Sequence, residues 1–216
     1  MPDSPRPPVL VVDYGRGNLF GLVRALQAVG CEPTISDNPK ALKDAERIVL
    51  PGVGAFGDAV GELGRRGFIE PMREAASSGT PLLGICVGCQ LLLESGEEHG
   101  VFRGLGLLGG VVRRLPEPND SASPWRVPNV GWRSVVPTRA DTIVSDVKGD
   151  RMVYFVHSYA PVVNDPAVVA AVLSFNGAEI PVALQQRNIA GVQFHPERSG
   201  EVGLGILRKF ADLKAR

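Results

Sequence analysis

Cys86 has the surroundings that are typical of a reactive cysteine. It lies in the run Gly84-Ile85-Cys86-Val87-Gly88, where an apolar strand turns abruptly into a helix that is expected to begin near Cys89. The pattern G-x-C-x-G is the cysteine version of the nucleophile elbow, in which flanking glycines let strand and helix approach closely. The helix dipole favours the thiolate form, and the N–H of Val87 points to where an oxyanion would form. Because free cysteine is also among the most buried residue types, a structural role stays open until a partner base is found.

A candidate base occurs near the end of the chain. The segment 189–194 is apolar enough for a buried strand, and His195-Pro196-Glu197 follows at its tip, because Pro196 cannot continue a sheet ladder. With one residue between them, His195 and Glu197 can lean to the same side. The imidazole could then take a proton from Cys86, while the carboxylate fixes its tautomer and supports the imidazolium.

The run Pro51-Gly52-Val53-Gly54 is a candidate for holding a negative charge. It follows an expected strand over 47–50, and the glycines on either side of Val53 allow backbone N–H groups to face a ligand, as in anion-binding nests. An ordinary glycine-rich loop would show the same pattern. Open α/β sheets place their sites at the carboxyl ends of parallel strands, which favours a second oxyanion donor in this run.

Strands and helices alternate in the first half of the chain. Continuous apolar runs, typical of parallel strands buried on both faces, are followed by glycine turns and by apolar residues at helical spacing. This order predicts an α/β fold with a mostly parallel central sheet and flanking helices. The expected strands cover 9–13, 33–36, 47–50 and 81–86, and the expected helices cover 19–29 and 58–78, the latter broken at Gly67 and Pro71.

From Leu105 onward the pattern changes to short apolar runs separated by Pro, Gly, Asn and Asp, which indicates antiparallel strands and hairpins. Asn176-Gly177 is a strong hairpin signal. We expect additional strands in this C-terminal half at 111–115, 152–159, 168–175 and 180–185, and a closing helix over 201–215. Loops or turns are expected at the acidic segment 94–100 and at 116–124 and 127–132.

Composition narrows the class of protein. With 216 residues the chain suits one domain, and we expect residues 1–8 to form a disordered or extended tail before a domain over 9–216. The 23 basic residues balance the 23 acidic ones, so nucleic acid and membranes are not expected as partners. Residues 1–8 are proline-rich and lack the apolar core of a signal peptide, and no later stretch has about 18 uninterrupted apolar residues. The three cysteines fit a reducing compartment. We therefore expect a cytoplasmic protein.

Two other patterns suggest different kinds of site. The pair Gly15-x-Gly17 is a fragment of a dinucleotide fingerprint, but it lacks the third glycine and a downstream acidic ribose ligand. The spacing Cys86-x-x-Cys89 is compatible with a thioredoxin-like or zinc motif, yet zinc would need a second ligand pair, which His99 alone does not supply. Core packing is the favoured role for Cys89, and we expect no metal and no other cofactor.

The segments around Cys86 and His195 together resemble the class I glutamine amidotransferases, whose triad is Cys, His and Glu in this chain order. The two main signatures are Gly84-Ile85-Cys86-Val87-Gly88-Cys89-Gln90 and Gln193-Phe194-His195-Pro196-Glu197. Further segments are similar to the glutaminase subunits of imidazole glycerol phosphate synthases, and the similarity covers nearly all of the chain after Pro8. These segments are Asp13-Tyr14-Gly15-Arg16-Gly17-Asn18, Pro51-Gly52-Val53-Gly54-Ala55-Phe56, Gly131-Trp132 and Tyr154-Phe155-Val156-His157-Ser158-Tyr159.

The resemblance implies a single-domain, flavodoxin-like α/β fold and the hydrolysis of glutamine to glutamate and ammonia. Ammonia would pass to a separate cyclase subunit with a (β/α)₈ barrel, in a heterodimer that serves histidine biosynthesis. Glutaminase subunits of anthranilate, aminodeoxychorismate or pyridoxal phosphate synthases share the triad and are the nearest alternatives. A non-catalytic regulatory module with the same fold is a further alternative, which the intact triad disfavours.

The resemblance also implies how the triad works. Cys86 would attack the side-chain amide of glutamine, His195 would carry the proton to the leaving ammonia, and Glu197 would orient His195. Backbone N–H groups would hold the tetrahedral oxyanion. The implied donors are Val87 together with one of Gly52, Val53 and Gly54.

Substrate and partner contacts follow from the same resemblance. Gln90 and Glu98 would help to bind glutamine. The family often has Met where Cys89 stands and Lys where Arg198 stands; Arg198 keeps the positive charge with a different geometry. The residues implied to lie near the partner subunit are Asn18, Asn129, Trp132 and Arg198.

Overall fold

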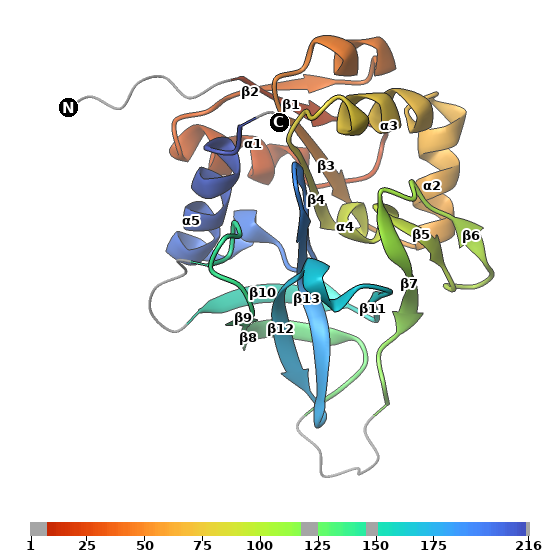
Figure 1. The fold of residues 1–216 in the computed structure, drawn as a ribbon, viewed down its shortest axis with the longest axis vertical. Helices are drawn as coiled ribbons and strands as arrows, with labels where there is room; N and C mark the ends of the chain where they lie inside the picture. Colours follow the sequence, from red (N-terminus) through yellow and green to blue (C-terminus); the bar gives the residue numbers. More distant parts are fainter. Residues whose placement is uncertain (1–7, 118–124, 146–150, 215–216) are drawn as a thin grey trace.

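A long mixed sheet runs through the centre of the molecule (Figure 1). The computed structural model describes residues 8–117, 125–145 and 151–214. Within them the central sheet has eight strands in the order β2-β1-β3-β4-β14-β13-β12-β9. These strands are β1 (Pro8–Val12), β2 (Glu32–Ser36), β3 (Ile48–Gly52), β4 (Leu82–Cys86), β9 (Val136–Pro137), β12 (Val169–Phe175), β13 (Ala178–Gln186) and β14 (Ile189–Val192).

The sheet is parallel from β2 through β1, β3 and β4 to β14, and antiparallel from β14 through β13 and β12 to β9. Every residue of β3 and β4 is buried, as expected for parallel strands that are covered on both faces. The predicted α/β fold, with a mostly parallel sheet and antiparallel strands in the C-terminal half, is confirmed.

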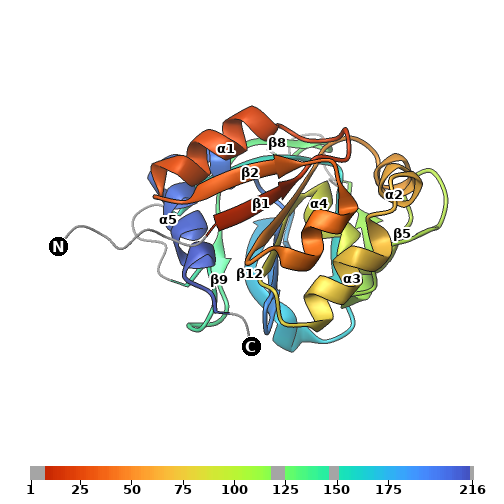
Figure 2. The same cartoon turned by 90° about the horizontal axis from the view of Figure 1, so that it is seen from above.

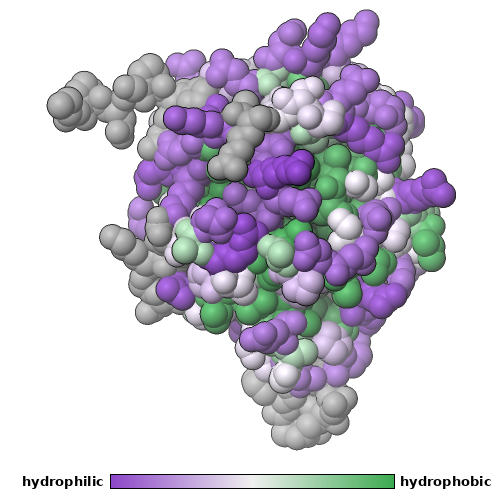
Figure 3. Space-filling model, in the orientation of Figure 1, coloured by the Kyte–Doolittle hydropathy of each residue, from purple (hydrophilic) through white to green (hydrophobic). Residues whose placement is uncertain are grey.

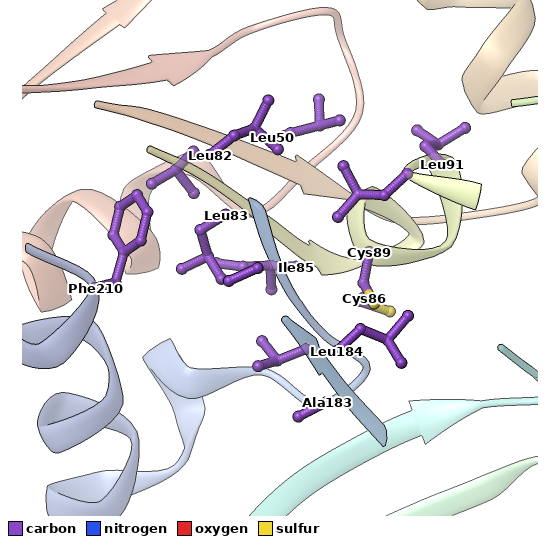
Figure 4. Packing of buried hydrophobic residues seen from close by; sticks show 14 of the residues in the cluster. Leu50, Leu82, Leu83, Ile85, Cys86, Cys89, Leu91, Ala183, Leu184 and Phe210 are labelled. Carbon is purple, nitrogen blue, oxygen red and sulfur yellow. The ribbon is translucent and has the colours of Figure 1, made fainter. Parts of the chain in front are cut away.

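Helices cover the parallel part of the sheet. Figure 2 shows α1 on one side of β1 and β2, and α3 on the other. Figure 4 shows Phe210 of α5 beside Leu82 and Leu83 of β4. Phe210 is fully buried, and burial of such a side chain contributes about 2 kcal/mol to the stability of the fold.

Among the described residues, no helix is both long and apolar enough to cross a membrane. The helices are α1 (Leu19–Ala28), α2 (Phe56–Arg65), α3 (Ile69–Ser77), α4 (Val87–Leu91) and α5 (Gly200–Ala211), with short 3₁₀ segments η1 (Pro39–Asp44), η2 (Pro166–Val168) and η3 (Pro196–Arg198).

Two smaller sheets flank the central one. β8 (Asn129–Ser134) pairs antiparallel with β10 (Met152–His157). Over β11 and β13, apolar side chains reach the surface among polar ones (Figure 3). The other small sheet has the strand order β11-β7-β5-β6. Its strands are β5 (Leu93–Gly96), β6 (Phe102–Arg103), β7 (Leu108–Arg114) and β11 (Tyr159–Val163).

Parts of the expected tail and loops are strands. Pro8, which we expected in the tail, is the first residue of β1. The expected loop 94–100 contains most of β5, and the expected turn 127–132 contains the start of β8. Both strands are made by pairing with distant segments rather than by local apolar alternation, so the local pattern did not reveal them. Of the expected loop 116–124, residues 118–124 lie outside the described residues.

Two helix boundaries near the site also differ from expectation. The elbow helix α4 begins at Val87 rather than near Cys89. Gly67 separates α2 from α3 as predicted, but Pro71 does not break α3. Pro71 lies in the first turn of that helix, where its missing N–H would have had no intrahelical acceptor.

The closing helix is shorter than expected. α5 ends at Ala211, with Asp212 as its C-cap, and not near residue 215. Just beyond this end, the guanidinium of Arg47 donates a hydrogen bond to the carbonyl of Leu213. This contact comes from the residue before β3, so no local signal in the last segment could have predicted it.

Candidate active site

The turn at Cys86 has the strained geometry of a nucleophile elbow. Cys86 is the last residue of β4 and has a φ of 55° and a ψ of −113°, in a region that non-glycine residues rarely adopt. A Cβ added to Gly84 would lie 2.5 Å from the carbonyl oxygen of Gly88, and one added to Gly88 would overlap the carbonyl oxygen of Leu50. Both glycines are therefore needed for strand and helix to meet at this turn.

The strand order brings the three candidate segments to one edge of the sheet. β4 lies between β3 and β14, and all three are parallel, so their carboxyl ends are adjacent. Gly52, the last residue of β3, is directly opposite Cys86 in the register. His195 follows three residues after Val192, the last residue of β14. The glycine loop, the cysteine and the histidine therefore meet at the edge where open α/β sheets place their sites.

A cavity of about 280 Å³ opens at this edge. It is slightly smaller than the pockets of about 300 to 1,000 Å³ that hold drug-sized ligands, so it suits a small molecule. Gly52 and Glu197 do not line it, and Glu197 lies behind His195. The lining residues include seven that we predicted from the sequence: Val53, Gly54, Cys86, Val87, Gln90, Glu98 and His195.

His195 is held by the carboxylate behind it. Its Nδ1 lies 2.9 Å from Oε1 of Glu197, and the two side chains are 7% and 3% exposed. Because a carboxylate can only accept, Nδ1 carries the proton, and Nε2 is left buried without a hydrogen-bond partner among the described residues. Burial by itself would lower the pKa of His195, but the Cys86 sulfur and the Glu197 carboxylate raise it above the ordinary value. The site therefore favours an imidazolium beside the cysteine.

Gln90 and Glu98 are fixed by contacts with other segments. The Nε2 of Gln90 donates to the carbonyl of Tyr159 at 3.0 Å and to Oε1 of Gln193 at 2.9 Å. Oε2 of Glu98 accepts a hydrogen bond from the N–H of Phe56 at 2.7 Å. This N–H belongs to the first residue of α2 and has no acceptor within the helix. Glu98 thus joins the acidic segment to the start of α2, and is not simply solvated.

The match to known proteins agrees with this geometry. A family model described as glutamine amidotransferase class I matches residues 10–212. The chain belongs to the class I glutamine amidotransferases. Among curated relatives of this amidotransferase, imidazole glycerol phosphate synthase subunit HisH of a Geobacillus species is 44% identical over 203 residues, which are 94% of this chain and 95% of that one. The subunit of the same name from Geobacter sulfurreducens is 41% identical over 207 residues, which are 95% and 99% of the two chains.

Solved structures agree on the fold of the amidotransferase. PurLQS from Thermotoga maritima matches with a TM-score of 0.71 at 22% identity, over 95% of this chain and 97% of that one. A glutamine amidotransferase from the same organism matches with a TM-score of 0.61 at 16% identity, over 91% and 79%. At these identities the likeness shows the fold alone.

His157 also lines the cavity of the amidotransferase, but both of its ring nitrogens are engaged. Nδ1 lies 2.9 Å from the carbonyl of Tyr159, and Nε2 lies 2.9 Å from Nδ2 of Asn129. Burial lowers the pKa of His157 to about 4, the hydrogen bond to Tyr159 opposes this, and the nearby His195 lowers it further. His157 is therefore a neutral residue that donates through Nδ1 and accepts at Nε2.

The low pKa of His157 predicts a pH-dependent stability. The unfolded chain binds a proton here below its ordinary value of 6.5, and the folded chain does so only near 4. Neutral His157 therefore contributes its full share to the free energy of unfolding above pH 6.5. This share is lost as the pH falls from 6.5 to about 4, and the loss amounts to up to about 3 kcal/mol. When urea unfolding is measured at several pH values, the free energy of unfolding should fall less toward low pH in His157→Gln than in the wild type. Equal losses in the two proteins would contradict the assignment.

Replacing Glu197 tests the support of His195 in the amidotransferase. Glu197→Gln keeps the shape but removes the charge that stabilises the imidazolium, so kcat for glutamine hydrolysis should fall about a hundredfold or more. The control is Glu70→Gln, which removes a carboxylate whose side chain is 70% exposed on α3 and should leave kcat unchanged. Turnover of Glu197→Gln within about threefold of wild type, at an unchanged melting temperature, would refute the role.

The four residues expected near a partner lie in different settings. Asn18 is exposed and caps α1 by accepting from the N–H of Gly21. Trp132 is 47% exposed, and the exposed guanidinium of Arg198 lies 4.3 Å from the centre of the Tyr154 ring. Asn129 differs from these, because it is only 1% exposed and contacts His157 inside the chain. The Asn129 side chain is therefore buried inside the chain and is not available at the surface for a partner subunit.

Sequence reasoning did not single out Gln193 as a site residue. It is fully buried and lies between Gln90 and Cys86. A signal was available, since a carboxamide at a buried position beside a strand needs hydrogen-bond partners inside the protein. The partners themselves come from segments far away in the chain, so the sequence could not name them.

Proposed function

We propose that this amidotransferase is the glutaminase subunit of an imidazole glycerol phosphate synthase. It hydrolyses glutamine to glutamate and ammonia, and the ammonia passes to a cyclase subunit for histidine biosynthesis. The observation that carries the proposal is the small cavity that Cys86 and His195 line together, with Glu197 bonded to His195. Relatives that are 41% and 44% identical over nearly the whole chain, and that are named as subunits of this synthase, support the choice of synthase.

The first half of the reaction makes a thioester. The Cys86 sulfur attacks the side-chain amide carbon of glutamine, and the carbonyl oxygen becomes an oxyanion. His195 gives its Nε2 proton to the amide nitrogen, the carbon–nitrogen bond breaks, and ammonia leaves. The N–H of Val87 and one from the Gly52–Gly54 loop hold the oxyanion, at about 3 kcal/mol per donor in the barrier.

The second half returns the enzyme to its starting state. A water molecule gives a proton to Nε2 of His195 and attacks the thioester carbon. The carbon–sulfur bond then breaks, which releases glutamate and the Cys86 thiolate. Glu197 keeps the proton on Nδ1 of His195 through both halves, so that Nε2 alone exchanges protons.

Gln90 and Glu98 are proposed to recognise the substrate. Glu98 uses one carboxylate oxygen for the N–H of Phe56, which leaves the other for the ammonium group of glutamine. Gln90 uses its Nε2 for contacts within the chain, which leaves its Oε1 to accept from the substrate. Both side chains line the cavity.

The partner is proposed to be a (β/α)₈ cyclase subunit in the cytoplasm, bound as a heterodimer. Trp132 and Arg198 are exposed near Tyr154, where ring contacts hold both side chains, and Asn18 is exposed at the start of α1. An aromatic ring and a guanidinium held in this way lose little freedom on binding, which favours their use at an interface.

The experiment that tests the function is a reconstitution. The purified chain is mixed with a cyclase subunit and its nucleotide substrate, and product formation from glutamine is measured. Product should form at a rate that matches glutamate release. Glutaminase subunits of other synthases are the alternative, so partners from the anthranilate, aminodeoxychorismate and pyridoxal phosphate synthases are tested in parallel. Turnover with one of those partners and none with the cyclase would overturn the proposal.

Activity of the isolated chain is expected to be weak. Free hydrolysis would consume glutamine without product, so glutamate release should rise about a hundredfold or more when the cyclase subunit and its nucleotide are added. Glutamate release is compared for the chain alone, with the partner, and with partner and nucleotide. High release from the isolated chain that neither addition changes would reject this expectation.

A further inference from the structure

Gln193 touches the sulfur of the proposed nucleophile. Its Nε2 lies 3.7 Å from Sγ of Cys86, a hydrogen-bond distance when the acceptor is sulfur. Gln193 is 0% exposed and Cys86 is 5% exposed, so water does not compete strongly for this contact. Hydrogen bonds to a charged acceptor in such surroundings are among the stronger ones in proteins.

The orientation of the Gln193 carboxamide follows from its neighbours. A backbone carbonyl can only accept, so the Gln90 atom that faces the carbonyl of Tyr159 must be Nε2. The same Nε2 faces Gln193, so the Gln193 atom there must be the acceptor, Oε1. The remaining end of the Gln193 carboxamide is Nε2, a donor, and it is directed at the Cys86 sulfur.

The backbone around Gln193 is also anchored. Its N–H donates to the carbonyl of Val182 at 2.8 Å, which continues the pairing of β14 with β13 by one residue. The carbonyl of Tyr159 accepts from Gln90 and is bonded to Nδ1 of His157 as well. The donor that faces the sulfur is thus held from two directions.

We propose that Gln193 is an additional catalytic residue, whose carboxamide holds the Cys86 sulfur in its attacking position and stabilises the thiolate form. This inference rests on the proposed role of Cys86 as the nucleophile. In this arrangement His195 and Gln193 both face the sulfur, and Gln193 does so without exchanging a proton. The titratable groups that lie around the sulfur or its histidine in the described part of the chain include Tyr14, Cys89, Glu98, His157, Tyr159, His195 and Glu197.

Alkylation of Cys86 by iodoacetamide tests the inference without glutamine or a partner. The rate is measured by peptide mass spectrometry from about pH 6 to about pH 9, around the ordinary range of a thiol. In Gln193→Met, which removes the donor, the rate at neutral pH should fall about tenfold, and the pH profile should move to higher pH. In the complex, kcat with glutamine should fall about tenfold or more while KM changes less than about threefold.

Gln185→Met is the matched control. Gln185 is another buried carboxamide, on the neighbouring β13, and its Oε1 accepts from the N–H of Ile143 far from the cavity. This control should lose a similar amount of stability and keep the alkylation rate and kcat within about twofold of wild type. A Gln193→Met protein that is as stable as the control and is alkylated at the wild-type rate would overturn the inference.

A second variant covers the case in which Gln193→Met does not fold. Gln193→Glu has the same length and keeps an acceptor for Gln90, but its carboxylate has no donor for the sulfur. It should show the same loss of alkylation rate, and wild-type alkylation would contradict the inference. If the wild type hydrolyses no glutamine with any partner, the proposed function fails, and the alkylation comparison still decides the contact between Gln193 and Cys86.

Discussion

Replacing Cys86 with alanine is expected to abolish glutamine-dependent synthesis by the complex and to leave ammonia-dependent synthesis intact. Without the sulfur no thioester can form, and the remaining binding groups supply only a small part of the catalysis. The loss with glutamine should be about ten thousandfold or more. Added ammonia bypasses the glutaminase site, so the cyclase should turn over at its wild-type rate. The two rates are measured in the same assembled complex.

The matched control for this prediction is Cys89→Ala. Cys89 lies next to Cys86 in the core, is 0% exposed, and has a thiol whose pKa burial raises well above the ordinary value (Figure 4). Its removal should cost about 1 to 2 kcal/mol of stability and leave glutamine-dependent synthesis within about threefold of wild type. Two outcomes would contradict the assigned role of Cys86. One is glutamine-dependent synthesis by Cys86→Ala, and the other is loss of both activities in a normally assembled complex.

Gly88→Ala is expected to destabilise the protein strongly and to disable the site. The new Cβ would overlap the carbonyl oxygen of Leu50, which belongs to β3 and cannot move without disturbing the sheet. Forcing backbone atoms apart at this turn should cost about 3 kcal/mol or more and should also displace Cys86 from the cavity. The urea concentration at the midpoint of unfolding and the rate of glutamate release should therefore both be lower than in the wild type.

At two other glycines, replacement by alanine should raise the stability of the protein. Gly61 in α2 and Gly205 in α5 have nothing within 4 Å of an added Cβ. Alanine is the better helix former, so each of these changes should stabilise the protein by about 0.5 to 1 kcal/mol and leave activity unchanged. A Gly88→Ala protein that is as stable and active as these controls would show that strand and helix do not need a glycine at this turn.

The parts of the site that are local in the sequence were predictable. The elbow occupies only Gly84 to Gly88, so its pattern can be recognised in the sequence. His195 and Glu197 have one residue between them, and this spacing lets both side chains lean to the same side of the chain. The alternation of apolar runs and helical periods was enough for the α/β fold, because the strands concerned are buried on both faces. The family resemblance supplied the link between the two distant segments.

The parts that depend on distant pairing were not predictable. Gln90 and Gln193 are 103 residues apart and meet only because β14 lies beside β4. β8 was hidden because its apolar residues Val130 and Trp132 are exposed while Asn129 is buried, and because its partner strand β10 begins only at Met152. That pairing also buries Asn129 against His157, which the sequence alone could not show.

The amide nitrogen of glutamine is expected to leave at Cys86 and to reach the partner subunit. Glutamine that carries heavy nitrogen in its side-chain amide is supplied to the complex of this chain with a cyclase subunit, in the presence of unlabelled ammonium. Mass spectrometry then follows the label in the imidazole product and in free ammonium. The product should carry the label in step with glutamate release, and Cys86→Ala should remove this labelling. Product that takes its nitrogen from the unlabelled ammonium while the wild-type enzyme releases glutamate would contradict transfer of ammonia from Cys86 to the partner.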